Sequence, residues 1–169
     1  AINVHLERYA TLTSTYLELA RRAKLCLEDE VSESELISWW SELASFGSPQ
    51  PNLRPWFSAH PSELDLTPSS YDLWLEVNLI ELWSHRRDQI EQSGRGEQRI
   101  QMKRMWADLA HKAQREVSAA LCQLARLAIE RSGSRHLCLT GPLALDPMIA
   151  TRFAQLSDLD RVYIPPMPS

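Results

Sequence analysis

The histidines are the first residues to consider for chemistry, because imidazole serves both as an acid–base group and as a common metal ligand. They are spread along the chain without the HxxxH or HExxH spacing of metal sites, at His5, His60, His85, His111 and His136. Each is therefore interpreted as a surface or locally hydrogen-bonded side chain. No GxSxG word marks a nucleophilic serine, so the sequence assigns neither a metal ligand nor a catalytic residue.

The three cysteines, Cys26, Cys122 and Cys138, are odd in number and form no CxxC pair. This pattern argues against a disulfide framework or a zinc ribbon and favours a reducing compartment. Cys138 lies in a short apolar run, so we expect it to be a small buried side chain, and Cys122 likewise.

Two residues near the end of the chain have types and positions that matter for local structure. Asp146 directly precedes Pro147. An aspartate before a proline predicts a helix N-cap followed by the first helical residue. Gly141 and Pro142 follow the apolar run and indicate a turn.

The elements that must position these residues are mostly helical. Apolar residues recur at steps of three and four, which predicts helices over residues 2–27, 33–45, 71–91 and 97–132. Ser32 and Glu35 fit a capping box at the start of the second helix. Gly47 and Gly133 fit the ends of the second and fourth helices. Residues 48–70 contain five prolines and predict a long surface loop.

The sequence also predicts whether several large or charged side chains are buried or exposed. Trp56 and Phe57 should attach the middle of the loop to the core. The pair Trp39-Trp40 is expected in the core or in an interface, since large aromatic residues are enriched in both. The run Arg86-Arg87 is expected to lie on a solvated helix face.

The pattern changes after Gly133. Residues 135–140 predict a short buried strand, residues 161–164 predict a second strand, and residues 147–157 between them predict a helix. A strand, helix and strand in succession indicate a parallel crossover. The predicted fold class is therefore α/β, with about four helices before a β-α-β end. We interpret residues 1–169 as one partial domain, divided into a helical part (1–47), the loop (48–70), long helices (71–133) and the β-α-β end (134–169).

Composition and charge exclude several classes of function. The 169 residues are 44% hydrophobic and 24% charged, which is ordinary for a soluble globular protein. The net charge of −4 disfavours wrapping of nucleic acid, where clustered basic residues dominate affinity. No apolar run approaches the ~20 residues that cross a bilayer, and the N-terminus has no signal-peptide pattern. We expect a cytoplasmic protein without nucleic-acid or membrane partners.

Residues 107–169 resemble the C-terminal half of the O-carbamoyltransferase family of the nodulation and antibiotic-tailoring type. The matching words, in family order and spacing, are Ser132-Gly133, Leu137-Cys138-Leu139, Gly141, Ala144-Leu145 and Asp160-Arg161-Val162-Tyr163. A weaker match lies upstream, where residues 43–47 are similar to the end of the family segment G-K-x-M-G-L-A-x-Y-G.

This resemblance implies the actin-like, sugar-kinase-like ATPase fold. It implies transfer of a carbamoyl group from carbamoyl phosphate, through carbamoyl-adenylate made by a YrdC-like domain, to a hydroxyl of a small-molecule acceptor. ATP and a divalent metal, iron or magnesium, would serve the whole protein. The turn residues Gly141, Pro142 and Asp146 would lie at the nucleotide, since glycine lets the backbone approach a phosphate or ribose closely. Gly141 as a simple turn former remains the alternative.

This sequence departs from the family pattern at four positions. The second glycine of the turn is Pro142, and the asparagine that ends the motif is Asp146. Upstream, Trp39 replaces the family lysine and Glu42 its second glycine. The family's histidine motif and YrdC-like domain lie outside these residues, and Ser169 falls just before the family's metal-binding D-A-G motif. We therefore expect a piece of a longer enzyme. An inactive helical partner or regulator derived from the family is the alternative, and a tRNA-modifying relative of the same fold fits less well.

Overall fold

The computed structural model describes residues 2–27, 30, 32–56 and 68–165. Helices α1 (Ile2–Leu27), α2 (Leu36–Ser45), α3 (Pro68–Glu91) and α4 (Arg95–Ser132) precede a small α/β unit. That unit consists of β1 (His136–Cys138), the 3₁₀ helix η3 (Pro142–Leu145), α5 (Pro147–Ala154) and β2 (Arg161–Tyr163). The α/β class and the order of helices before a β-α-β end are as the sequence predicts.

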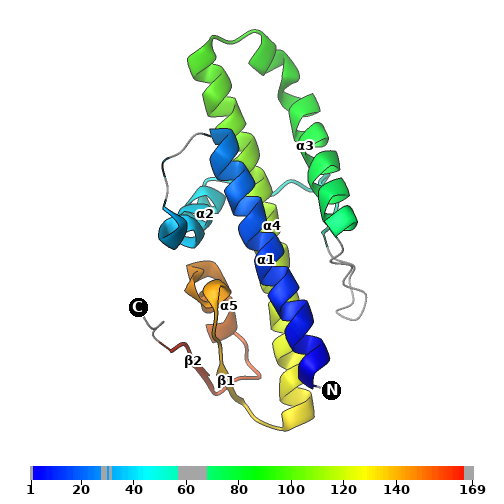
Figure 1. Ribbon diagram of the computed structural model, residues 1–169, viewed down its shortest axis with the longest axis vertical. Helices are drawn as coiled ribbons and strands as arrows, with labels where there is room; N and C mark the ends of the chain where they lie inside the picture. Colours follow the sequence, from blue (N-terminus) through cyan, green and yellow to red (C-terminus); the bar gives the residue numbers. More distant parts are fainter. Residues whose placement is uncertain (1, 28–29, 31, 57–67, 166–169) are drawn as a thin grey trace.

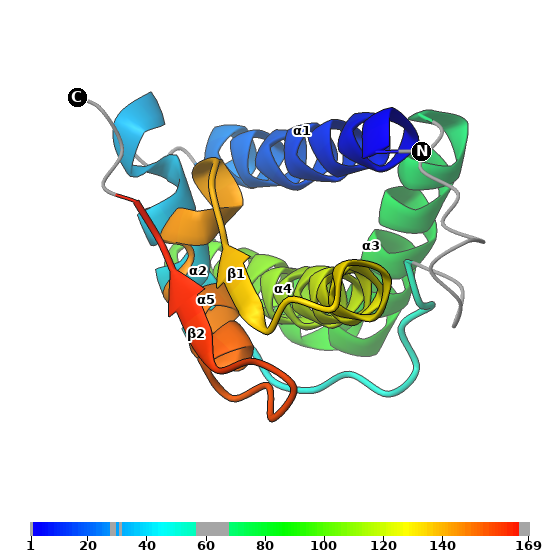
Figure 2. The same ribbon diagram turned by 90° about the horizontal axis from the view of Figure 1, so that it is seen from below.

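Helix α4 forms the long axis of the molecule, and α1, α2, α3 and α5 all pack against it (Figure 1). Seen along that axis, α3 lies on one side of α4, while α2 and α5 lie on the other (Figure 2). The packing surface of α4 mixes large residues with alanines, which let neighbouring helices approach closely. Its buried apolar residues are Met105, Trp106, Ala107, Leu109, Ala110, Ala113, Val117, Ala120, Leu121 and Ala125.

Strands β1 and β2 are parallel, with Leu137 opposite Val162, so the predicted crossover is confirmed. The prediction that the first of these strands is buried is wrong. Within each strand only the central residue is partly covered, and its two neighbours are exposed. Cys138 is therefore exposed and Cys122 only partly buried. The physical reason is that the described sheet has two strands, and within them only the central residues Leu137 and Val162 pack against the core.

The helix ends differ from the predicted ones by a few residues. Gly133 takes the left-handed conformation at φ 67° and ends α4, as expected. Helix α4 begins at Arg95, and α3 begins at Pro68, inside the segment predicted as loop. Ser32 does not form the predicted capping box, because the Glu35 N–H donates to the Ser32 carbonyl at 3.1 Å and not to the Ser32 hydroxyl, which itself donates to the Glu35 carboxylate at 2.8 Å. A 3₁₀ turn, η1 (Glu33–Glu35), leads into α2 instead.

The first part of the proline-rich segment is held against α3 and α4. Trp56 is buried and stacks on Trp74 with ring centroids 5.0 Å apart, which confirms the expected anchor. The buried Asn78 side chain accepts from the Arg54 backbone N–H at 2.8 Å, and the Trp74 indole donates to the Arg54 carbonyl at 2.9 Å. Phe57 and the rest of the predicted loop up to residue 67 lie outside the described residues.

The prediction of a solvated Arg86-Arg87 face is wrong for Arg86. Its guanidinium forms an ion pair with Asp108 of α4, and the two side chains are 20% and 5% exposed. Asp108 also accepts from the Ser48 N–H at 2.8 Å and from the Gln50 amide at 3.0 Å. Arg86 follows the buried Leu82 by one helical turn, so it lies on the α3 face that packs on α4. Arg87, one residue on, is exposed as expected.

Candidate functional site

The connection between β1 and α5 carries the turn residues that the resemblance singles out. Beyond β1, the Leu139 N–H donates to the Tyr163 carbonyl at 2.9 Å, and the chain then leaves the sheet. Gly141 takes φ 90° and ψ 175°, a region that is essentially restricted to glycine. A Cβ added at Gly141 would meet nothing within 4 Å. The requirement for glycine is therefore conformational, and the space beside its Cα is open.

Pro142 begins η3, where a proline fits because first-turn N–H groups have no helical partner. The Ala144 N–H donates back to the Gly141 carbonyl at 3.0 Å. Pro142 thus sets the direction of the chain after Gly141. As a proline, it has no backbone N–H to donate.

Asp146 caps α5. Its side chain accepts from the N–H groups of Met148 at 3.0 Å and Ile149 at 3.3 Å, and Pro147 takes the first helical position. The predicted N-cap is confirmed. Asp146 is also completely buried, which the sequence did not indicate.

Three further side chains converge on the Asp146 carboxylate. The Tyr16 hydroxyl of α1 donates to Oδ2 at 2.9 Å, and the Gln114 amide of α4 lies 3.0 and 3.1 Å from the two oxygens. The Ser41 hydroxyl of α2 donates at 3.4 Å and accepts from the Gln114 amide at 2.9 Å. We call Tyr16, Ser41, Gln114 and Asp146 the Asp146 network. It joins α1, α2, α4 and α5 at one point.

The donors to Asp146 in these contacts are neutral: a phenol, a hydroxyl, an amide and two backbone N–H groups. The amino terminus of α5 adds the positive end of the helix dipole. Burial raises the pKa of Tyr16 well above its usual value, and the nearby Asp146 charge raises that pKa further. Tyr16 therefore stays protonated and keeps its role as a donor at neutral pH.

We expect the stability of the protein to fall above about pH 10 because of Tyr16, since an unfolded tyrosine has a pKa of about 10. Its folded pKa is raised, so the unfolded state loses the proton first. The contribution of Tyr16 is then complete below pH 10 and declines above it, by at most about 1.4 kcal/mol per pH unit. Urea denaturation from pH 7 to 11 should show this slope, and Tyr16→Phe should reduce it. Tyr163→Phe, which removes a phenol that is 61% exposed, is the matched control. An unchanged slope in Tyr16→Phe would contradict the assignment.

Sequence reasoning identified Asp146 but missed its partners. Tyr16 and Gln114 each lie within an apolar helical stripe, and this position is the one feature of the sequence that could have indicated a buried polar contact. Gln114 follows Ala113 and precedes Val117 on the buried side of α4. A polar side chain in such a position needs a hydrogen-bonding partner, but the sequence does not say which one.

The upstream region of resemblance lies beside the turn. Helix α2 contacts η3, so the segment that ends near Gly47 and the segment around Gly141 belong to one neighbourhood. Within α2, Trp40 is fully buried and meets Tyr16 edge-on with centroids 6.2 Å apart, while Trp39 is partly buried against the same core. The expectation that this pair packs in the core is confirmed. Glu42 is exposed.

Other candidate sites are few in the part of the chain that is described. Those residues contain no group of three or more His, Cys, Asp or Glu side chains arranged to hold a metal ion. A cavity of about 240 Å³, lined by Leu27, Arg99 and Lys103 among others, lies by the first turns of α4, at the opposite end of that helix from β1. The described helices include none with the length and apolar character needed to cross a membrane.

Comparison with known proteins adds no relative. No family model, no curated protein and no solved structure matches this chain.

Proposed function

We propose that this chain is part of an O-carbamoyltransferase, from the actin-like ATPase domain. In the whole protein the reaction would move a carbamoyl group from carbamoyl phosphate, through carbamoyl-adenylate, to a hydroxyl of a small-molecule acceptor. The whole protein would be cytoplasmic. It would contain a YrdC-like domain and would use ATP and a divalent metal, iron or magnesium. The described residues lack a metal-binding cluster, so we assign no metal to them.

The observation that carries this proposal is the path of the chain from β1 to α5. The segment that resembles the family motif forms a parallel strand, a glycine turn and a capped helix in succession. In parallel α/β sheets, ligands bind beyond the carboxyl ends of the strands. Gly141 lies at that position, with open space beside its Cα. This arrangement supports the approach of a nucleotide to the Gly141 backbone.

The three turn residues then have different roles in the proposal. Gly141 would contact the nucleotide through its backbone, and Pro142 would orient the turn. Asp146 would act as a positioning residue, because its buried carboxylate is already bonded within the protein. It would hold the amino terminus of α5 in place below the turn without touching the nucleotide.

We expect Gly141→Ala to weaken ATP binding by about tenfold or more, since alanine is strained at φ 90° and would shift the turn. Titration calorimetry with ATP on the folded chain measures this affinity. Gly96→Ala is the matched control, because Gly96 also has open space around it and lies in the first turn of α4, at the end of that helix opposite β1. Equal ATP affinities in the two variants would show that the glycine turn does not take part in nucleotide binding.

A second candidate is an inactive partner or regulator descended from this family. Its supporting observation is that Asp146 occupies the amino terminus of α5 with a negative charge, where an anionic phosphate would otherwise be favoured. The same titration separates the two candidates. ATP binding with a micromolar Kd favours the enzyme, and absence of binding by the folded full-length protein favours the inactive relative, because a piece of the enzyme need not bind ATP by itself.

A further inference from the structure

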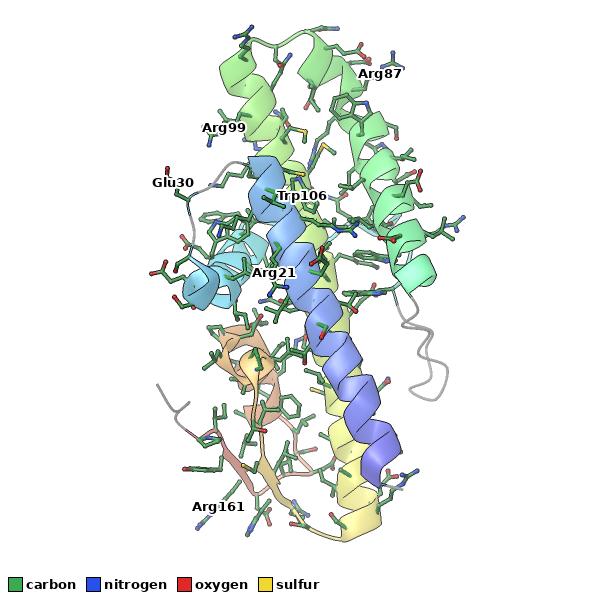
Figure 3. The ribbon with its side chains drawn as sticks, in the orientation of Figure 1. Arg21, Glu30, Arg87, Arg99, Trp106 and Arg161 are labelled. Carbon is green, nitrogen blue, oxygen red and sulfur yellow. The ribbon has the colours of Figure 1, made fainter. Side chains whose placement is uncertain are left out.

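Tyr16 links α1 directly to the segment between β1 and α5. Its side chain is completely buried, in the same helical stripe as Leu12 and Leu19. The ring meets Trp40 of α2 edge-on, and the hydroxyl reaches the Asp146 carboxylate. Helix α1 itself packs on α2 and α4, and side chains fill the space between these helices and α5 (Figure 3). The hydrogen bond from Tyr16 therefore crosses this space and connects two distant parts of the chain.

The two oxygens of the Asp146 carboxylate have different partners. Oδ1 caps α5, because it accepts from the N–H groups of Met148 at 3.0 Å and Ile149 at 3.3 Å. Oδ2 accepts from the Tyr16 hydroxyl at 2.9 Å. The Gln114 amide lies at similar distances, 3.0 and 3.1 Å, from both oxygens, so it does not distinguish between them. Tyr16 thus holds Oδ2 on the side of α1 and leaves Oδ1 to the amino terminus of α5.

Asp146 is also the residue at which the glycine turn joins α5. The Ala144 N–H donates to the Gly141 carbonyl at 3.0 Å, and the Asp146 N–H donates to the Leu143 carbonyl at 3.2 Å. The Asp146 carbonyl in turn accepts from the Ala150 N–H at 3.0 Å, inside α5. Successive backbone hydrogen bonds therefore connect Gly141 to α5 through Asp146. A rotation at Asp146 changes the direction of the whole turn.

We propose that Tyr16 is a positioning residue for the glycine turn, through which α1 takes part in nucleotide binding without touching the nucleotide. The inference rests on the proposed function, which places the nucleotide at the Gly141 backbone. Without the phenol hydroxyl, the Gln114 amide is the one donor to Oδ2 that remains among the described contacts. The carboxylate can then turn, the capped N–H groups open more often, and Gly141 is held less firmly for the nucleotide.

Hydrogen exchange of the whole protein, followed by mass spectrometry, tests the positioning. The peptide that contains Met148 and Ile149 should exchange about five- to tenfold faster in Tyr16→Phe than in the wild type, which is the effect of one buried hydrogen bond. Trp74→Phe is the matched control. It also removes a hydrogen-bond donor from a buried aromatic ring, here one that donates to the Arg54 carbonyl, and α3 lies on the opposite side of α4 from α5 (Figure 2). This control should leave exchange of the peptide unchanged.

Titration of the whole protein with ATP tests the consequence for binding. Tyr16→Phe should raise the Kd for ATP by about three- to tenfold, and Trp74→Phe should leave it unchanged. A role of Tyr16 in packing alone would lower the stability of the fold without changing the ATP affinity of the folded molecules, because phenylalanine fills the same space. Circular dichroism confirms that both variants are folded.

Two results would overturn the inference. One is exchange of the Met148 peptide that rises no more in Tyr16→Phe than in Trp74→Phe. The other is an equal, measurable ATP affinity in the wild type and in Tyr16→Phe. A wild-type protein that does not bind ATP contradicts the proposed function instead, and the exchange result alone then decides whether Tyr16 positions the turn.

Discussion

Replacement of Asp146 by alanine is expected to lower the free energy of unfolding by about 2–4 kcal/mol. The loss has two sources. The cap on α5 disappears, which costs about 1 kcal/mol. The buried Tyr16 hydroxyl also loses its acceptor, and an unsatisfied buried group costs about 1–3 kcal/mol. The Gln114 amide keeps the Ser41 hydroxyl as its acceptor. Water cannot easily compensate, since Asp146 is fully buried.

Urea denaturation followed by circular dichroism measures this loss, and Asp146→Asn is the matched control. An asparagine keeps the size of the side chain and an oxygen that can accept from Met148 and Ile149. Its amide can donate to the Tyr16 oxygen, so we expect a loss of only about 1 kcal/mol. If Asp146→Ala cost no more than Asp146→Asn, the network would contribute little beyond the cap.

The Asp146 network shows where prediction from sequence succeeds and where it stops. The cap was predictable because Asp-Pro is a local signal, and the capped N–H groups lie two and three residues away. Its partnership with Tyr16 spans 130 positions, and no local pattern carries such information. The four long helices were predictable for the same reason as the cap, since helical periodicity is local.

Predictions failed where burial depends on neighbours that the sequence does not identify. The apolar run around Cys138 predicts a buried strand, but the described sheet is too small to cover that strand. The sequence predicts a solvent-exposed Arg86, because the next residue is also an arginine. Its actual environment follows from its position one turn after the buried Leu82, on the α3 face that packs on α4, where it lies beside Asp108. For the turn itself, sequence resemblance supplied Gly141, and the open space beside it became visible only in three dimensions.

At Gly47 the predicted helix end is correct, but the reason for a glycine there is incomplete. It was expected only to end a helix, and α2 does end just before it, at Ser45. The structure adds a steric requirement. A Cβ at Gly47 would lie 2.1 Å from the Ala107 carbonyl oxygen and 2.7 Å from His111 Cβ. The first of these atoms belongs to the backbone of α4 and cannot rotate away.

Gly47→Ala should therefore destabilise the protein by about 3 kcal/mol, because α2 and α4 must separate to admit the methyl group. Gly96→Ala is the matched change, in an exposed part of α4 with nothing within 4 Å. There alanine favours the helix and should raise stability by about 0.5–1 kcal/mol. Urea denaturation of both variants tests whether the two substitutions change the free energy of unfolding in opposite directions. A mild effect at Gly47 would mean that α2 can move on α4, and the placement of α2 beside the Gly141 turn would then be adjustable.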